Sequence, residues 1–410
     1  MPDYIGTSND EEMITVRKRG DSFPRLAIEA DGNIKTGVGT TRPVGDLPFS
    51  SPITGGPNSK ALQRFRTALA GRNAAPCDIF HLGDSITWDY AGLSLANRWT
   101  SVFRDTLRTR FPCNPAVVGG HGFISSDPTF DVIVHTDTMS TIDGTATAVS
   151  SNFGPDLNGL VLDAASEGMT ITFTGTGLDL FYAQFGGGGT FSYAVDGGGA
   201  TNIVTNGATN YAARNQAIRS LSVASHTVVI RWVSGLCYFT GAFAYNGDET
   251  KGIRSTVAAT PTTTSGYWWD VNHYWTAHIP QLLPDLVTIQ LGPNDYGGVA
   301  PLSVATFKSN VQAIIADVKS KAGYSPSFVL LPVWPLTPAA PLDTWEKYVT
   351  AMYEIAAADS DNVCICDWGL RTSMTAGTTI GGILSGDFTH PSTLGNRYLG
   401  EQLAQFVSPF

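Results

Sequence analysis

The sequence predicts an α/β protein in which a parallel five-stranded sheet lies between two layers of helices, with an antiparallel β domain inserted into it. Apolar runs of strand length alternate with amphipathic helical segments in the last third of the chain. A long glycine-rich stretch in the middle alternates apolar and polar residues instead, which is typical of antiparallel sheets. Polar and nucleophilic residues follow several apolar runs, where ligand sites of parallel α/β sheets form.

The α/β part is expected to be flavodoxin-like. Its strands are predicted over 77–82, 115–118, 286–291, 327–333 and 362–367, and its helices over 96–110, 268–282, 303–321, 342–358 and 392–407. In the helix over 303–321, Phe307, Val311 and Ile314 recur at the spacing of one buried face. Because crossovers between parallel strands are right-handed, the ends of these strands meet at one edge of the sheet.

The middle of the chain, over 125–265, is predicted to be an inserted β-sandwich. Runs at 169–173, 178–182, 191–195 and 226–232 have strand length. The glycine-rich segments 186–189 and 197–199 are interpreted as hairpin turns. Aromatic side chains of this stretch either stack on sugar rings or form the sandwich core; they are Tyr182, Tyr193, Trp232, Tyr238 and Phe239. The predicted domains are thus an N-terminal arm over 1–55, an α/β domain over 56–124 and 266–410, and the insertion.

The most informative motif is Gly83-Asp84-Ser85-Ile86, which follows the apolar run 79–82 and precedes a segment that can become helix. A serine at the end of a central parallel strand lies in the crevice of the sheet and near the positive end of a helix. The same tripeptide occurs at Gly20-Asp21-Ser22, but there it follows three basic residues and is interpreted as a polar turn. Ser85 is therefore the candidate nucleophile.

Three further segments supply partners for Ser85. His390 is the candidate general base, and Asp387, three residues earlier, is close enough to orient its ring. The amide group of Asn294, the backbone N–H of Ser85 and a glycine N–H are candidate oxyanion donors. The glycine is either Gly120 or Gly122, and both remain candidates. Asp84 and Asp295 are expected to organise turns by hydrogen bonds.

Serine, glycine, asparagine and Asp-x-x-His follow one another in this order, and here the chain resembles the SGNH (GDSL-type) hydrolase family. The resemblance covers 77–123 and 267–410. It implies a three-layer α/β/α sandwich and an acyl-transfer activity that needs no cofactor. The segment Val195-Asp196-Gly197-Gly198, followed by His226-Thr227-Val228, resembles jelly-roll modules that accompany some polysaccharide esterases.

Other chemistries find less support in the sequence. No H-E-x-x-H or Cys-x-x-Cys spacing is present, so no metal site is expected, and the glycine-rich turns lack the phosphate-binding patterns. The net charge of −10, without a long basic cluster, argues against nucleic acid as a partner. No apolar run approaches the ~20 residues of a membrane span. The cysteines are expected to be mostly buried free thiols, with a disulfide as the alternative. The histidines other than His390 are expected to be structural or at the surface, except that His121, in the glycine block, is a candidate for contact with substrate.

The N-terminal arm is predicted to contain a short hairpin with its turn at Asp31-Gly32. Asp31-Gly32-Asn33-Ile34, followed by Gly37-Val38-Gly39, resembles segments of bacteriophage tail proteins. This resemblance implies trimerisation or virion assembly through the arm. The first residues lack a signal-peptide pattern, so an extracellular or virion-associated protein is expected that leaves its cell by another route or has had a leader removed.

Together these observations predict a serine esterase that removes acetyl or other short acyl groups from a polysaccharide or cell-wall glycan. An esterase or lipase acting on small or lipid esters is the alternative within the enzymes. A glycan-binding virion or surface adhesin with a silent hydrolase scaffold is the alternative from another class.

Overall fold

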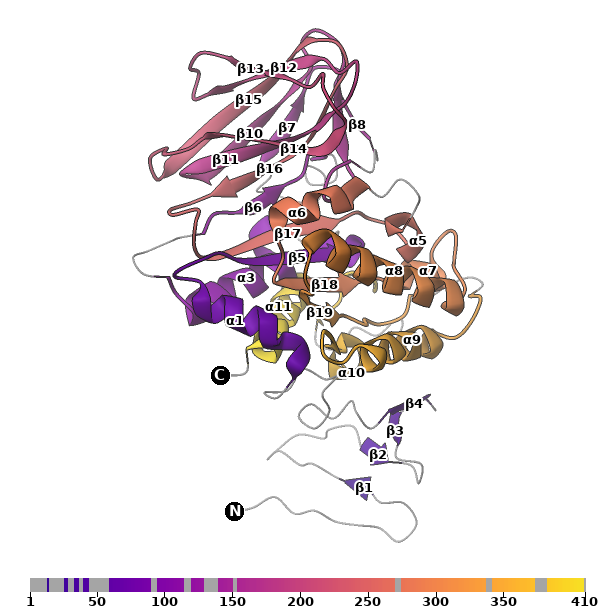
Figure 1. Ribbon diagram of the computed structural model, residues 1–410. Helices are drawn as coiled ribbons and strands as arrows, with labels where there is room; N and C mark the ends of the chain where they lie inside the picture. Colours follow the sequence, from indigo (N-terminus) through magenta and orange to yellow (C-terminus); the bar gives the residue numbers. More distant parts are fainter. Residues whose placement is uncertain are drawn as a thin grey trace.

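The computed structural model describes residues 13–14, 26–28, 33–36, 40–43, 59–89, 94–113, 119–128, 139–149, 153–269, 274–336, 341–372 and 382–408. Two main bodies are visible, a β-sandwich and an α/β domain (Figure 1). Each has its own hydrophobic core. None of the helices within the described ranges is long and apolar enough to cross a membrane.

The α/β domain contains a five-stranded parallel sheet, as predicted. Its strand order is β17-β5-β18-β19-β20, and the strands are β5 (Cys77–Gly83), β17 (Ile253–Ala259), β18 (Leu286–Gln290), β19 (Ser327–Leu330) and β20 (Val363–Ile365). β5 is paired on both sides, with β17 and with β18. Its seven residues are almost all buried, which explains why it appears in the sequence as a continuous apolar run.

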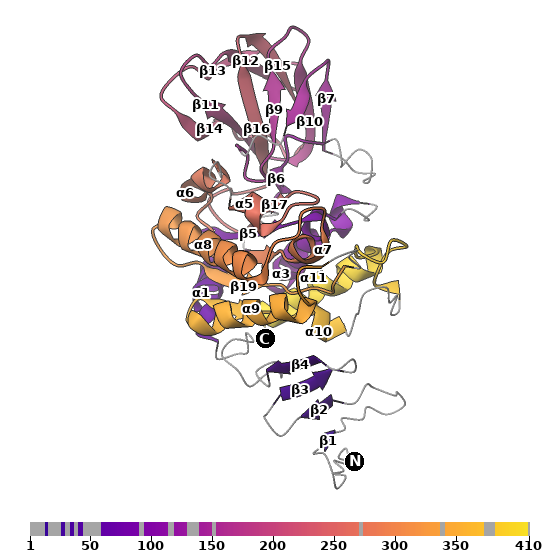
Figure 2. The same ribbon diagram turned by 90° about the vertical axis from the view of Figure 1, so that its right-hand side faces the viewer.

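Helices cover both faces of this sheet (Figure 2). Neighbouring side chains of β5 point to opposite faces: His81 contacts Trp99 and Phe103 of α3 (Trp99–Arg110), and Phe80 stacks on Trp275 of η5 (Tyr274–His278). α3 packs against α11 (Thr393–Val407), and α8 (Val304–Ala322) packs against α9 (Trp345–Ala358). The three-layer arrangement predicted from the sequence is therefore present.

The predicted helix over 268–282 is wrong as a single element. The chain instead forms α5 (Ser265–Trp268), η5 and α6 (Ile279–Leu282). α6 ends at Leu283, which takes a left-handed φ of 42°, and Pro284 follows, which cannot continue a helix. The segment is nevertheless apolar on its inner side, since Trp268 and Trp275 are fully buried. Shorter helical pieces, α1 (Gln63–Gly71) and α10 (Trp368–Thr372), were not predicted.

The inserted domain consists of two antiparallel sheets with a shared core. One sheet has the order β13-β12-β15-β10-β7, and the other has the order β14-β11-β16-β9-β8 with β6 beside β16. The bounds are β6 (Gly122–Ile124), β7 (Ser140–Asp143), β8 (Thr147–Val149), β9 (Gly159–Leu162), β10 (Gly168–Gly175), β11 (Gly177–Gln184), β12 (Thr190–Val195), β13 (Thr201–Val204), β14 (Asn210–Ile218), β15 (Ala224–Ser234) and β16 (Cys237–Tyr245). Ile171 and Phe191 of one sheet meet Leu180 and Phe239 of the other in the core. All four strands predicted for this stretch are present.

Two details of the sandwich differ from the prediction. Residues 197–199 do turn between the paired strands β12 and β13. Residues 186–189 do not form a hairpin turn, because β11 and β12 belong to different sheets. Among the aromatic candidates, Phe239 and Tyr193 lie in the core.

The insertion begins and ends at other residues than the sequence suggested. β6 already pairs with β16 of the sandwich, and β17, which was assigned to the insertion, pairs in parallel with β5 of the α/β sheet. β17 is a short segment of mixed apolar and polar residues between Gly252 and Pro261, and its pattern alone cannot assign it to either sheet. The strand expected over 115–118 falls on residues 114–118, which lie outside the described residues.

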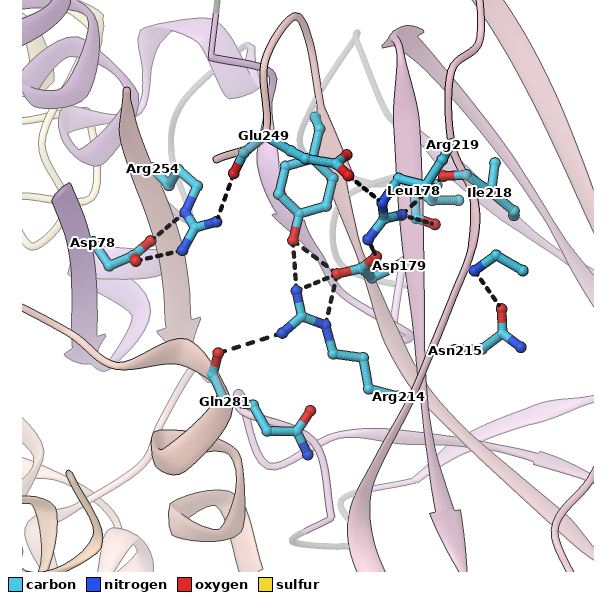
Figure 3. A network of polar contacts seen from close by, with 12 residues as sticks. Asp78, Leu178, Asp179, Arg214, Asn215, Ile218, Arg219, Glu249, Arg254 and Gln281 are labelled. Carbon is cyan, nitrogen blue, oxygen red and sulfur yellow. Dashed lines mark hydrogen bonds and ion pairs between the residues drawn. The ribbon is translucent and has the colours of Figure 1, made fainter. Parts of the chain in front are cut away.

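A polar network joins the two bodies (Figure 3). Asp179 of β11 is fully buried and binds the guanidinium groups of Arg214 and Arg219. The Tyr245 hydroxyl donates to the same carboxylate at 2.7 Å. Arg214 also donates to the carbonyl of Gln281 in α6, which belongs to the α/β domain. The buried charge of Asp179 is thus compensated across the boundary between the bodies.

The network continues into the parallel sheet. Arg219 binds the Glu249 carboxylate at 2.6 Å, and Arg254 of β17 donates to the Glu249 carbonyl. Arg254 in turn pairs with Asp78 of β5 through two hydrogen bonds. The bidentate contact links the second residues of the two adjacent parallel strands, which are paired in register.

The N-terminal residues contribute a small antiparallel sheet of β1 (Met13–Ile14), β2 (Leu26–Ile28), β3 (Asn33–Thr36) and β4 (Thr40–Pro43), in that order. β2 and β3 pair on either side of the expected turn. The turn residues Asp31 and Gly32 lie outside the described residues.

Replacing Asp179 by asparagine should lower the free energy of unfolding by about 3–5 kcal/mol, because Arg214 would keep its partly buried charge without this counter-ion and Arg219 would retain only Glu249. Equilibrium unfolding in urea measures this change. The matched control is Glu401→Gln, which removes an exposed ion pair with Arg397 and should cost no more than ~0.5 kcal/mol. Equal effects of the two changes would contradict the role given to the network.

Candidate active site

Three residues from distant parts of the chain form a continuous hydrogen-bonded series. The Ser85 hydroxyl lies 2.8 Å from Nε2 of His390, and Nδ1 of His390 lies 2.6 Å from the Asp387 carboxylate. Ser85 and His390 are 305 residues apart in sequence. The structure therefore brings the three predicted residues together in the order nucleophile, base and orienting acid.

Ser85 occupies the first residue of α2 (Ser85–Trp88), directly after β5. Asp84 is the N-cap: its carboxylate accepts from the Ile86 N–H at 2.9 Å, which fixes the turn between strand and helix. Asp84 itself is buried, while Ser85 remains partly exposed. The helix is also held from its outer side, because the Trp99 indole donates to the Ile86 carbonyl.

His390 and Asp387 lie in a turn shaped by the Asp387 carboxylate. Its Oδ1 accepts from the Ser385 hydroxyl and from the N–H groups of Thr389 and His390. Burial alone would raise the pKa of Asp387, but the hydrogen bonds from Ser385, His390 and Thr389 outweigh it and lower the pKa to about 2. Asp387 is therefore ionised at neutral pH and can hold the His390 ring by an ionic hydrogen bond.

Asn294 follows β18 (Leu286–Gln290), the strand next to β5 in the sheet. It follows Gly292 and Pro293 at the start of α7 (Pro293–Gly297), after β18. Its side-chain amide is 3.4 Å from the Asp84 carboxylate and donates to the carbonyl of Thr263 at 3.0 Å. The structure thus places Asn294 next to the turn that carries Ser85.

Gly120 and Gly122 are not brought to Ser85. A side chain at Gly120 would collide with the backbone of Ala244 and Asn246, and one at Gly122 with the carbonyl of Ser255. Ser255 lies four positions before the end of β17, where Ala259 pairs with Gly83. At about 3.3 Å per residue, this is roughly 13 Å back along the sheet. The two glycines serve close packing between the sandwich and β17 instead.

The segment that does lie beside Gly83 and Asn294 is the loop 260–264, which the sequence analysis missed. The Thr260 N–H donates to the Gly83 carbonyl, and Thr263 provides the carbonyl that Asn294 binds. Thr262 has a φ of 65°, which is uncommon for a β-branched residue. Pro261 after an apolar run was the available signal that a strand ends here.

Two buried carboxyl groups organise turns at the site by hydrogen bonds, as predicted. Asp84 caps α2, and Asp295 accepts from the N–H and the hydroxyl of Ser265, which holds the start of α5. Burial raises the pKa of Asp84 to about 7 and that of Asp295 to about 6, although each accepts hydrogen bonds. Both carboxyl groups are therefore partly protonated near neutral pH.

The remaining described histidines have structural partners. His81 and His278 are buried, and desolvation lowers the pKa of His81 to about 3 and that of His278 to about 4. His226 binds Asp196, which raises its pKa. His121 lines a small cavity together with Trp88, Asp156 and Ala259, and burial and nearby arginines lower its pKa to about 3. His135 and His273 lie outside the described residues.

The cysteines are unpaired. Cys77, Cys237, Cys364 and Cys366 are buried, and Cys113 is half-buried. This confirms the prediction of mostly buried free thiols. Within the described ranges, no three His, Cys, Asp or Glu side chains are grouped as metal ligands.

Part of the chain matches a known protein family. Residues 238–398 match the GDSL-like Lipase/Acylhydrolase family. This stretch contains Asn294, Asp387 and His390, while Ser85 precedes it because the sandwich is inserted between them. No curated protein in the comparison matches the chain.

Solved structures with a similar fold include a peptidoglycan O-acetylesterase, which is 14% identical with a TM-score of 0.62 and covers 85% of this chain and 95% of its own. A family 2 carbohydrate esterase from Corynascus thermopiles (Myceliophthora fergusii) is 17% identical over 61% of this chain and 95% of its own, with a TM-score of 0.32. One from Clostridium thermocellum, in complex with cellohexaose, is 14% identical over 65% and 97%, with a TM-score of 0.30. The family match and the first structure confirm the predicted resemblance to SGNH (GDSL-type) hydrolases and the predicted fold.

The raised pKa of Asp84 makes stability depend on pH. An aspartate in the unfolded chain has a pKa near 3.9, so the neutral form is favoured by folding. Its contribution to stability is fully present below about pH 4 and is lost as the pH rises through about 7. Asp84→Asn should therefore flatten the fall in the free energy of unfolding between pH 4 and 7, measured in urea at several pH values.

Asparagine can still cap α2, so this variant should fold. Asp295 and Asp156, whose pKa values burial raises to about 6, keep part of the slope. The control Glu401→Gln should leave the slope as it is in the native chain. An unchanged slope in Asp84→Asn would contradict the assignment.

Proposed function

We propose that this chain, which carries a GDSL-like hydrolase domain on an SGNH-type fold, is a serine esterase that removes acetyl or other short acyl groups from a polysaccharide or cell-wall glycan. The observation that carries the proposal is the series Ser85–His390–Asp387, with distances of 2.8 and 2.6 Å. A serine hydroxyl becomes a nucleophile only when a base accepts its proton, and this geometry provides that base.

The reaction follows from these contacts. Ser85 Oγ attacks the ester carbonyl carbon while its proton passes to Nε2 of His390. The C–O bond to the sugar then breaks, and His390 returns the proton to the leaving alkoxide. Water, deprotonated by His390, hydrolyses the acyl group from Ser85 in the same two steps. Asp387 remains ionised throughout and stabilises the positively charged ring.

Negative charge develops on the carbonyl oxygen during both attacks. The N–H of Ser85 at the start of α2 and the amide group of Asn294 are the proposed donors to this oxygen. The loop 260–264, which binds Asn294 and the strand end at Gly83, takes the place that the sequence analysis gave to Gly120 or Gly122. Its backbone is the proposed source of a third donor.

The support for the substrate class is a similarity of fold and not a contact within the site. One solved structure with a similar fold, at a TM-score of 0.62, is described as a peptidoglycan O-acetylesterase. At 14% identity this likeness supports the fold and makes O-acetylated glycans the first substrates to test. Esters of lipids and of small alcohols are the alternative within the enzymes, and glycan binding without acyl release is the alternative from another class.

Location and assembly remain predictions from the sequence. We expect an extracellular or virion-associated protein, since polysaccharides and cell walls are found there. The N-terminal arm is proposed to mediate trimerisation or virion assembly. Multi-angle light scattering tests the first of these, and a monomer at micromolar concentration would contradict it.

Ser85→Ala should abolish hydrolysis of p-nitrophenyl acetate and of O-acetylated polysaccharides, by about 10⁶-fold in kcat. Acetate release is measured beside circular dichroism, which checks the fold. The chain offers a matched control in the second Gly-Asp-Ser segment: Ser22→Ala should keep full activity. Equal rates for the native chain and Ser85→Ala would exclude Ser85 as nucleophile and favour the binding protein.

Asp387→Asn should lower kcat by about 10⁴-fold, because the neutral amide no longer stabilises the charged ring of His390. Asn294→Ala should lower kcat by about 10²–10³-fold through the loss of one oxyanion donor. Steady-state kinetics on an acetate ester measures both. If Asn294→Ala changed KM alone, its amide would contact the substrate but would not stabilise the transition state.

A further inference from the structure

Phe388 is an exposed aromatic residue within the catalytic turn. It stands between Asp387 and Thr389, two residues before His390, and its side chain is 47% exposed. Its backbone has a φ of 57°, in the left-handed region. Glycine occupies this region freely, whereas a residue with a Cβ is disfavoured there. An exposed phenylalanine therefore costs stability at this position through both its backbone and its surface.

The conformation of Phe388 is imposed by the catalytic carboxylate. The Phe388 N–H donates to the Ser385 carbonyl at 3.1 Å, and the two following N–H groups both donate to Asp387. The turn is closed by the Ser385 N–H, which donates to the His390 carbonyl at 2.8 Å. The hydrogen bonds that hold His390 in place thus also hold the backbone of Phe388 relative to it. Strained residues of this kind are concentrated at functional sites.

The proposed reaction indicates what lies beside His390, two residues after Phe388. His390 gives its proton to the leaving alkoxide, so the alcohol part of the ester must lie next to Nε2 of His390. In a glycan ester that alcohol is a sugar ring. A pyranose exposes axial C–H bonds on its faces, and such a face packs on a flat aromatic ring while its hydroxyl groups stay in water.

We propose that Phe388 is a positioning residue on which the pyranose ring that carries the acyl group stacks. The inference rests on the proposed esterase function and names the element that recognises its leaving group. The ring orients the ester oxygen toward His390 and favours a sugar over an open-chain alcohol. Phe388 thereby acts on binding and orientation, while Ser85, Asp387 and His390 act on the bonds.

The chain contains a matched control for Phe388. Leu283 is also 47% exposed and also has a left-handed φ, of 42°. It lies between α6 and β18, near the amino end of the parallel strands and away from the catalytic edge. A change to glycine removes an exposed apolar side chain and relieves the backbone at both positions.

The experiment compares Phe388→Gly and Leu283→Gly on an O-acetylated xylan, an O-acetylated peptidoglycan and ethyl acetate. In Phe388→Gly, the ratio of kcat/KM on a glycan to kcat/KM on ethyl acetate should fall about ten-fold, mainly through KM. In Leu283→Gly the ratio should match that of the native chain. Neither variant should have a lower Tm, since both relieve strain. An unchanged ratio in Phe388→Gly would overturn the proposal.

Two further variants separate the effect of ring stacking from the effect of side-chain size. Phe388→Tyr keeps the flat ring and should retain the native ratio, whereas Phe388→Leu keeps an apolar side chain without a ring face and should lose most of it. Equal ratios for tyrosine and leucine would also overturn stacking.

A binding measurement separates this inference from the esterase proposal. Titration calorimetry with an O-acetylated oligosaccharide is made on Ser85→Ala with and without Phe388→Gly. A Kd about ten-fold weaker in the double variant supports the stacking role even if the chain hydrolyses no ester, and an equal Kd contradicts it. Loss of ethyl acetate hydrolysis in Ser85→Ala decides the esterase function independently.

Discussion

The site depends on the central position of β5 in the parallel sheet. Because β5 is hydrogen-bonded to β17 on one side and to β18 on the other, its carboxyl end adjoins the ends of both neighbours. Gly83, the loop 260–264 and Asn294 therefore lie close together at this edge of the sheet. The turn with His390, which directly precedes α11, reaches the same edge. The fold allows this convergence because the buried β5 cannot shift its register without exposing apolar side chains.

The parts of this arrangement that were predictable are those with strong local signals. The buried strands at 77–82 and 286–291 are near-continuous apolar runs, and the long helices over 303–321 and 392–407 repeat their apolar residues at the helical period; the structure has all four within a few residues. The short Gly83-Asp84-Ser85 and Asp387-x-x-His390 motifs were recognisable because each directly adjoins such an element. Their mutual contact required only that strand ends of a parallel sheet lie together.

The two glycine candidates for the oxyanion donor were placed wrongly because no local signal shows which sheet the chain enters next. Gly120 and Gly122 follow an apolar run, but the chain leaves the α/β domain there and enters the sandwich at β6. The segment that reaches the site, 260–264, follows a strand within a stretch that looks like the rest of the sandwich. Periodicity describes which face of a strand is buried and not which sheet the strand joins. The assignment of β17 depends on long-range pairing and on ionic contacts such as Arg254 with Asp78, which leave no local pattern.

The pairing of β6 with β16 has a consequence for how the chain folds. Gly122–Ile124 lies beside Ala242–Ala244, so the two ends of the insertion meet within the sandwich. Once the sandwich has formed, the chain that separates β5 from β17 is effectively shortened to residues 84–121, before the pairing, and residues 246–252, after it. The entropic cost of closing the parallel sheet then becomes that of a shorter loop, and it falls by about 0.6 kcal/mol for each halving of the loop length. The inserted domain is in this sense a folding aid for the sheet that it interrupts, and the parallel sheet is expected to assemble after it.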